Sequence, residues 1–454
     1  MQPTGAECVI IHNMAVADSE FSCHLSREHI REMAPDYPTS RAADDLALGD
    51  KWGAAGWGDT PSGDRLLWAE FVEGKRAPTR VTASLPAMRL TCSCAALRFP
   101  CRHMIALLSR HLAGTIPPGA VPDWVTGLER GPAPGAHAKD SPDNPVRRAA
   151  LVAGMADLAR WLGDMVGQGL AAQARGNRAP WLDAANRLVD AYAFEAAREL
   201  RDMSAIPGSG PDWPERLLPR MGRLALLCEA FRRFDELSPA ERADALAAAA
   251  RSPRPEGPPV AGDWLVVGHR AETEGRQLRI RTWLYGVTAR RWAVLSDTIA
   301  GGRLDGFHLP TGATARGELA FIPGAWPVSA RPVSPLRLAP PVDGSGTGMA
   351  TTIDEAIAGY AAALSANPWL SAYPMTLREV FVEPPEPGRK GWRLRDRDGL
   401  LLPLPEPFAH GWRLLSLSAG RPPALFGEWD NGVFVPLSVF DGGWQAMAGR
   451  REVP

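Results

Sequence analysis

Four metal-binding side chains lie within twelve residues of one another, in the run T-C-S-C-A-A-L-R-F-P-C-R-H-M. They are Cys92, Cys94, Cys101 and His103, in the pattern C-x-C-x(6)-C-x-H. The alternative, a disulfide framework, is disfavoured because the six cysteines of this 454-residue chain are few and clustered. A segment so rich in ligands is expected to fold around an ion, and this constrains the fold more than any other feature.

The spacing of the four ligands predicts their local structure. In an extended segment residues i and i+2 point to the same side, so Cys92 and Cys94 can present both sulfurs to one ion while Ser93 faces away. Inside a helix such a pair lies on roughly opposite faces, so Cys101 should lie at the helix entry, with His103 in the first turn. Three thiolates and one imidazole fill every position around a tetrahedral zinc ion, which predicts a structural site and not a catalytic one.

The other cysteines carry weaker hypotheses. Cys8, Cys23 and Cys228 stand apart in the sequence, and Cys228 fits the buried face of a helix. A second site made of Cys23, His24 and His29 is conceivable, but a solvated helix face explains these residues better.

Composition shifts along the chain predict an α+β multidomain protein. Stretches rich in Pro and Gly read as linkers, and apolar residues at helical spacing mark a helical middle. We predict an acidic N-terminal segment (1–64), β-strands plus the zinc finger (65–128, the finger at about 88–112), a linker (129–146), a helical domain (147–250), a second linker (251–263) and a strand-rich C-terminal region (264–454) that divides into two subdomains near 340–350.

Local patterns sharpen this division. Three helical faces are predicted in the middle, and Asp430-Asn431-Gly432 predicts a tight hairpin turn because Asn-Gly supplies two positive-φ positions. The first face is Leu151, Met155, Leu158, Leu162 and Met165; the second is Trp181, Ala185, Leu188, Tyr192 and Ala196; the third is Leu218, Met221, Ala225, Cys228 and Arg232, with Leu224, Phe231 and Phe234.

Charge excludes some functions and suggests others. The net charge of -1 excludes a globally polycationic nucleic-acid coat. Locally, residues 1–64 hold 11 acidic against 4 basic side chains, whereas residues 65–113 hold 8 basic against 2 acidic. No apolar run is long enough to span a membrane and no signal peptide is recognisable at the N-terminus, so we expect a cytoplasmic protein.

These residues carry a family resemblance. The zinc motif followed by an apolar helix resembles the SWIM zinc finger, and the wider run from LLWAEFVEG through CSCAALRFPCRHMIALL resembles bacterial SWIM zinc finger family proteins. The likeness extends over most of residues 33–330. Family members tend to have a Pro-Ser-Arg-Lys run after the second cysteine and a lysine in the last triplet, where this chain has Ala95-Ala96-Leu97-Arg98 and Arg102. The resemblance implies a ββα zinc module that binds DNA or proteins, and partners of the MoxR-type AAA ATPase and von Willebrand factor A domain classes.

Two functions follow from these observations. The first is a zinc-binding adaptor that contacts a protein partner. The alternative is nucleic-acid binding through a basic face of the finger, for which Arg89, Arg98 and Arg102 are the best contact residues, beside Phe99 as a stacking surface. Against the alternative, three thiolates leave the zinc site at a charge of about -1, and the arginines could instead pair with the acidic N-terminal segment.

Catalytic motifs are missing from the sequence. Gly74-Lys75 lacks the rest of a P-loop, Gly344-Ser345-Gly346 fits neither a dinucleotide-binding nor a nucleophile-elbow motif, and no H-E-x-x-H occurs. We therefore expect no enzyme and identify no small-molecule substrate. Since no apolar run could span a membrane, we expect no membrane partner either.

Overall fold

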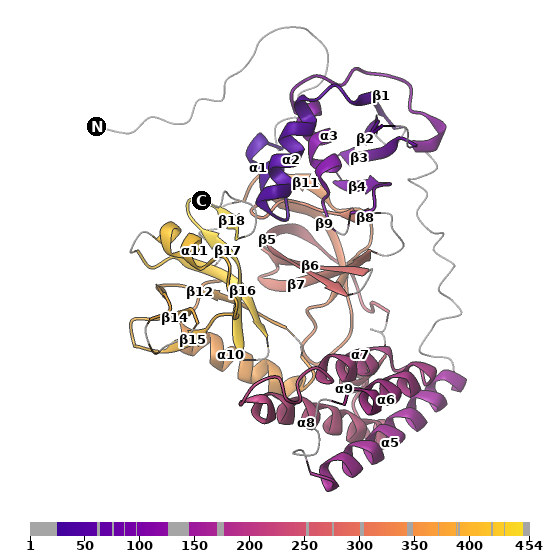
Figure 1. The fold of residues 1–454 in the computed structure, drawn as a ribbon, viewed down its shortest axis with the longest axis vertical. Helices are drawn as coiled ribbons and strands as arrows, with labels where there is room; N and C mark the ends of the chain where they lie inside the picture. The colour runs from indigo at the N-terminus through magenta and orange to yellow at the C-terminus, as the bar shows by residue number, and fades with distance from the viewer. Residues whose placement is uncertain are drawn as a thin grey trace.

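A computed structural model describes residues 25–447 of the chain, apart from short internal stretches. Around a central sheet it places an N-terminal sheet with its helices, a C-terminal pair of small sheets and a bundle of helices (Figure 1). The stretches left out are 61–63, 75–76, 86, 97, 126–144, 170–176, 251–253, 275–276, 300–303, 343–347, 371, 387, 389–390, 419–420 and 431.

The N-terminal sheet has the order β1-β2-β3-β4-β8, and all its pairings are antiparallel. Alternate residues of β2, Leu67 and Ala69, enter the same core as helix α3, as the period of two in a strand requires. Its elements are α1 (Arg27–Glu32), α2 (Tyr37–Leu48), β1 (Trp52–Asp59), β2 (Arg65–Phe71), β3 (Thr79–Leu85), β4 (Arg89–Cys92), α3 (Arg102–Leu112) and the distant β8 (Leu304–Phe307).

The helical middle consists of helices α5 (Pro145–Gly167), α6 (Ala179–Asp190), α7 (Phe194–Met203), α8 (Trp213–Arg232) and α9 (Pro239–Ala249), with a 3-10 turn at Phe234–Glu236. The buried residues of α5 are the five predicted for the first helical face. The second predicted face is interrupted, because Tyr192 takes a positive φ of 63° and ends α6 before α7 begins. On the third face Leu218 is 57% exposed, and its neighbour Leu217 is buried instead.

The central sheet has the order β10-β9-β5-β6-β7, with β11 also paired to β9. Its strands are β5 (Val260–Glu274), β6 (Gln277–Gly286), β7 (Arg291–Ile299), β9 (Thr314–Phe321), β10 (Ala330–Pro332) and β11 (Arg337–Ala339). Apolar residues of this sheet, such as Trp264, Leu284 and Leu319, share one hydrophobic core with the N-terminal sheet and α3.

The C-terminal part follows helix α10 (Ile353–Ala366). One sheet has the order β12-β16-β17-β18 and a smaller one the order β13-β14-β15. Strands β16 and β17 form the predicted hairpin, in which Asp430 pairs with Val433 and Gly432 has a φ of 87°. The elements are β12 (Tyr373–Leu377), β13 (Phe381–Glu383), β14 (Arg393–Arg395), β15 (Leu401–Pro403), α11 (Gly411–Ser418), β16 (Ala424–Asp430), β17 (Val433–Phe440) and β18 (Trp444–Ala446).

Three predicted boundaries need correction. Strand β1 lies inside the segment 1–64, where its small Gly and Ala residues gave no alternating pattern. Strand β5 begins at Val260, inside the predicted linker, because its first residues pair with β9. Strand β8 lies in the C-terminal region of the sequence but belongs to the N-terminal sheet, because it pairs with β4. In this pairing Cys92 lies opposite Leu304. Most of the predicted linker 129–146 and Cys8, Cys23 and His24 fall outside the described residues.

No helix among the described residues combines the length and apolar character needed to cross a bilayer. The structure therefore offers no helical membrane span within these ranges.

Asp244 joins the helical bundle to the rest of the chain. Its side chain is 7% exposed and accepts hydrogen bonds from the Ala325 backbone N–H (2.8 Å) and from Asn367 Nδ2 (2.9 Å). Burial raises the pKa of Asp244 to about 6, although the Ala325 N–H acts in the opposite direction.

This raised pKa predicts a pH dependence of stability. The folded state holds the Asp244 proton more tightly than the unfolded chain does. The stabilisation by protonated Asp244 is therefore complete below about pH 4 and is lost as pH rises through 6. We expect wild type to lose about 2 kcal/mol relative to Asp244→Asn between pH 4 and 6.5, measured as the difference in urea unfolding free energy. A constant difference across this range would contradict the assignment.

Candidate metal centre

Strand β4 delivers the first two cysteines. It ends at Cys92, and Ser93 stays bound to β3: the Ser93 N–H donates to the Arg80 carbonyl (3.0 Å) and the Arg80 N–H donates to Ser93 Oγ (2.9 Å). Ser93 thus faces away from the site, as its position between two ligands predicts. Cys94 follows at the rim and is partly exposed.

Helix α3 delivers the other two ligands. Cys101 is the N-cap residue, with extended backbone angles, and His103 lies in the first turn after Pro100, as predicted. Cys101 is 1% exposed and His103 is 4% exposed, because the apolar residues that follow hold the start of the helix in the core. The ββα module is therefore β3, β4 and α3.

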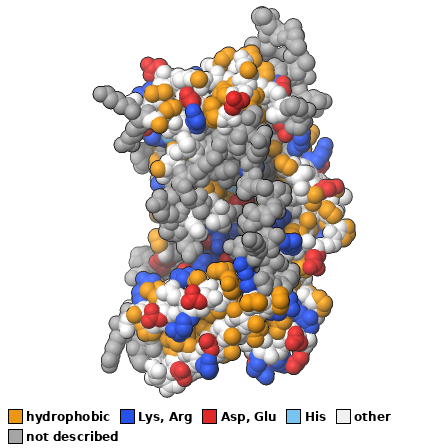
Figure 2. Space-filling view, turned by 90° about the vertical axis from the view of Figure 1, so that its right-hand side faces the viewer, with side chains coloured by type: hydrophobic (Ala, Val, Ile, Leu, Met, Phe, Trp, Pro, Cys, Tyr) orange, Lys and Arg blue, Asp and Glu red, His pale blue; other side chains and the backbone are white. Residues whose placement is uncertain are grey.

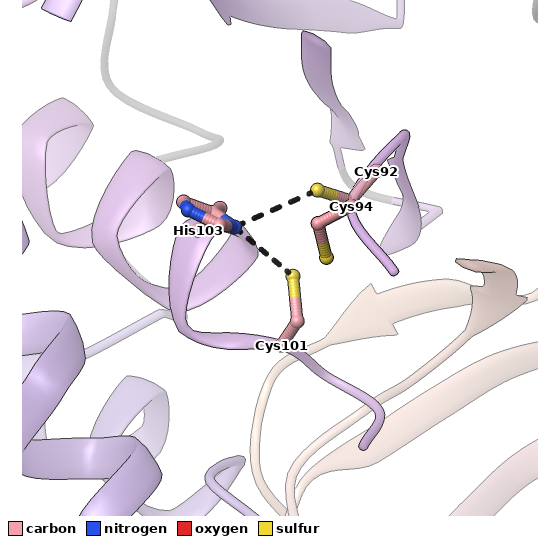
Figure 3. A group of neighbouring side chains, drawn as sticks. All are labelled: Cys92, Cys94, Cys101 and His103. Atoms are coloured by element: carbon pink, nitrogen blue, oxygen red, sulfur yellow. Dashed lines mark hydrogen bonds between the residues drawn. The ribbon is translucent and has the colours of Figure 1, made fainter. Parts of the chain in front are cut away.

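The four side chains converge on one point (Figure 3). His103 Nδ1 lies 3.9 Å from Cys92 Sγ and 4.0 Å from Cys101 Sγ, and all four ligand atoms lie within 4.8 Å of one another. Ligands at about 2.0 to 2.3 Å from a tetrahedral zinc ion are roughly 3.5 to 3.8 Å apart. The arrangement fits zinc after small adjustments, and all four coordination positions are taken by protein atoms.

The thiols also need a cation to ionise together. Hydrogen bonds from Cys101 and Cys92 lower the pKa of Cys94. Hydrogen bonding to Cys101 and Cys94, together with burial, raises the pKa of Cys92 well above its usual value. The Cys92 thiol lowers the pKa of Cys101. The opposing effects of Cys94 and of burial are larger and raise the pKa of Cys101 to about 12. Three thiolates so close together are the donor set that a divalent ion stabilises.

Aromatic rings enclose the histidine. The ring centroid of His103 lies 5.0 Å from that of Phe71, which contacts Trp52 at 5.2 Å. His103 Nε2 is buried and has no hydrogen-bond partner among the described residues, which leaves Nδ1 as the nitrogen that faces the thiols. Sequence spacing gave no sign of Phe71, because it comes from β2, more than 30 residues before His103.

Comparison with known protein families agrees with this geometry. The family model of the SWIM zinc finger matches residues 80–112, which are β3, β4 and α3. The chain contains a SWIM zinc finger. The cluster of Cys92, Cys94, Cys101 and His103 fits the motif of this finger and can hold its ion, and zinc has a structural role there.

A second family model, the SWIM-associated four-helix bundle domain, matches residues 146–249. This range coincides with helices α5 to α9. No curated protein and no solved structure matched the chain. The SWIM finger and its associated bundle thus occur together in one chain, separated by residues 113–145.

The arginines proposed as a contact face lie in different surroundings. Arg98 forms an ion pair with Asp36 (2.5 Å), and Arg102 lies 4.0 Å from Glu73. Arg110 donates to the Ala47 carbonyl (3.0 Å) and lies over Trp52. Arg89 lies on β4, next to β8.

Proposed function

We propose that this chain is a cytoplasmic, non-enzymatic adaptor in which the SWIM finger is a structural element. The observation that carries the proposal is the burial of six consecutive residues of α3, from His103 to Leu108. A helical turn takes 3.6 residues, so six consecutive buried residues leave this part of the helix no exposed face. A partner cannot contact the stretch from His103 to Leu108 without unfolding its surroundings.

The elements around α3 support a joining role. Helix α3 contacts helix α2 as well as strands β2 and β3, and strand β4 of the finger pairs with β8 of the C-terminal region. Phe99, next to the metal ligands, contacts His308, which stacks on His269 of β5 at 4.4 Å. The finger therefore connects the N-terminal helices to the central sheet.

The contacts of the arginines bear on the nucleic-acid alternative. Arg98 pairs with a carboxylate of the acidic N-terminal segment, which matches the scaffold interpretation of its charge. Exposed ion pairs are weak, and the Arg98 side chain is 59% exposed, so phosphate contact is a second candidate function to be tested. The nucleic-acid candidate is supported by the positive charge of residues 65–113.

A salt series separates the two candidates. We expect the zinc-loaded chain to bind labelled single- and double-stranded DNA and RNA weakly, with a flat dependence on salt. Phosphate binding through Arg98 and Arg102 would instead give a log-log slope of about -2 to -4, reduced by about one in each of Arg98→Ala and Arg102→Ala. That steep, arginine-dependent slope would replace the adaptor with a nucleic-acid-binding finger.

The protein partners are tested directly. The candidates are a MoxR-type AAA ATPase and a von Willebrand factor A domain protein, the classes implied by the family resemblance. We expect at least one, purified, to bind the zinc-loaded chain in calorimetry, with unchanged affinity for Arg98→Ala and loss of binding for Cys101→Ser. Absence of binding to both would overturn this choice of partners.

A further inference from the structure

We propose that Cys94 is an oxidation site, at which a peroxide converts the thiol cluster into a Cys94–Cys101 disulfide and so releases the zinc ion. Of the three cysteines in the cluster, Cys94 is partly exposed, whereas Cys92 is 0% and Cys101 1% exposed. Oxidation selects thiolates that solvent can reach, and buried structural cysteines are inert. The inference rests on the zinc site and goes beyond the adaptor function.

The surroundings of Cys94 leave it accessible to a small, uncharged oxidant. Ala95 and Ala96, which follow it, are exposed and have no side chain beyond the β-carbon. The nearest arginines in the sequence, Arg98 and Arg102, lie beside carboxylates. Basic and acidic side chains are also interspersed on the face of the N-terminal part that Figure 2 shows at the top of the view. An uncharged peroxide needs no field of one sign to approach, so hydrogen peroxide is the oxidant that fits.

Cys101 is the disulfide partner that the geometry favours. The sulfurs of Cys94 and Cys101 lie within 4.8 Å of each other, and the two side chains point toward each other in Figure 3. A disulfide needs the sulfurs at about 2 Å, and the loop 95–100 can adjust because its described residues form no helix or strand. Cys92 is less suited, since only Ser93 separates it from Cys94 and its strand is held between β3 and β8.

The reaction balances with hydrogen peroxide as the one oxidant. The Cys94 thiolate attacks a peroxide oxygen, the O–O bond breaks, and hydroxide leaves a sulfenic acid on Cys94. The Cys101 thiolate then attacks the Cys94 sulfur, the S–S bond forms, the S–O bond breaks and a second hydroxide leaves. The two thiolates lose two electrons, the peroxide gains them, and two protons from solvent turn the hydroxides into water. Cys92 and His103 remain as the two ligands, which is too few to hold a structural zinc ion.

The loop between the two cysteines also contacts the central sheet. Phe99 lies in this loop, is 3% exposed and packs against the His308 ring, which stacks on His269 of β5. A disulfide that draws the ends of the loop together displaces Phe99 from this contact. Oxidation therefore loosens the connection between the finger and the central sheet at the same time as it releases the ion.

Peroxide treatment of the full, zinc-loaded chain tests the proposal. The background variant replaces the three cysteines outside the cluster: Cys8→Ser, Cys23→Ser and Cys228→Ala. Zinc release is followed with a chromogenic chelator, the disulfide is mapped by mass spectrometry, and hydrogen exchange reports on residues 304–309. We expect one zinc ion released for each Cys94–Cys101 disulfide, loss of protection in 304–309, and recovery of zinc binding and protection after a thiol reductant and zinc are added.

Cys94→His is the matched variant in the same background. Histidine is also a zinc ligand, so a Cys2His2 cluster keeps the ion without the accessible thiol. We expect peroxide to release zinc from it at least about tenfold more slowly. If Cys94→His binds no zinc, the mapped disulfide of the background variant decides.

Three outcomes would contradict the proposal. Zinc that stays bound in millimolar peroxide would overturn it, and so would equal release rates from Cys94→His and the background variant. A disulfide that includes Cys92 would overturn the pairing with Cys101. None of these readouts involves a protein partner, so they leave the adaptor function to its own test.

Discussion

Cys94→Ser should abolish zinc binding and unfold far more of the chain than the finger. Structural zinc contributes on the order of 10 kcal/mol to the folding of such modules, and a serine hydroxyl does not replace the thiolate. Cys94 is the partly exposed ligand, so its replacement creates no cavity in the core. The loss of stability in Cys94→Ser therefore comes from the missing metal ion and not from poorer core packing.

The hydrophobic core that the finger shares with the central sheet determines how much of the chain unfolds when zinc is lost. Cys92 and Cys101 lie in the same hydrophobic cluster as Trp264 and Leu319 of the central sheet. Strand β8 has its ladder partner in β4, and the His308 N–H donates to the Met88 carbonyl (3.1 Å). When the finger melts, β8 loses its neighbour and the central sheet loses one side of its core.

Hydrogen exchange measures this spread. After zinc removal or in Cys94→Ser, we expect loss of protection in residues 79–112 and in 304–309, with the bundle α5 to α9 protected because it has its own core. The matched control is Cys228→Ala, which removes a buried, non-ligating thiol and should keep the zinc content and cost about 1 kcal/mol. Protection that survives in 304–309 while 79–112 is lost would show that the finger folds independently.

Glu428→Gln should cause the second largest loss of folding stability. Glu428 is fully buried and accepts hydrogen bonds from Arg270 (2.6 Å), Arg281 (2.9 Å) and Trp283 Nε1 (2.6 Å). Burial alone would raise the pKa of Glu428, but the two guanidinium groups and the indole N–H outweigh it and hold the pKa below its usual value. Removing the charge leaves two largely buried arginines without this partner, which costs about 3 to 5 kcal/mol.

The Glu428 carboxylate links the C-terminal sheet to the central sheet. Glu428 belongs to β16, whereas Arg270 and Arg281 belong to β5 and β6, so the C-terminal sheet should detach first. Glu272→Gln is the matched control, because Glu272 contacts the same arginines from a 39% exposed position and should cost less than about 1 kcal/mol. Urea unfolding of both variants gives the comparison, and equal costs would contradict the role of burial.

Acid should reproduce the Glu428 effect in the wild type. Since the folded-state pKa is depressed, the stabilisation is present above the unfolded pKa of about 4.3 and is lost as pH falls through the folded value. The stability difference between wild type and Glu428→Gln should therefore shrink below about pH 4. Asp244 changes in the opposite sense, over a higher pH range.

Local patterns were sufficient for the parts of the fold that depend on neighbours in sequence. Ligand spacing predicted the zinc site, with Cys101 as the N-cap of α3 and His103 in its first turn. Helical periodicity predicted the buried face of α5, and Asn-Gly predicted the β16–β17 hairpin. In each case the interacting residues lie within one or two turns, or one hairpin, of each other, so their spacing alone expresses the geometry.

Other features depend on residues far apart in the chain. Strand β8 has only four residues and no pattern of its own, and its place beside β4 comes from pairing with a strand more than 200 residues earlier. The sequence pattern of the β16–β17 hairpin does not indicate that Glu428 is buried, and its burial is tolerated because Arg270, Arg281 and Trp283 reach it from another sheet. The specific partner of Arg98, Asp36 at the start of α2, is brought to it by the packing of α2 on α3. Hydrogen bonds between strands, buried ion pairs and helix burial depend on which surfaces meet in space, and a period or a motif records only what is close in sequence.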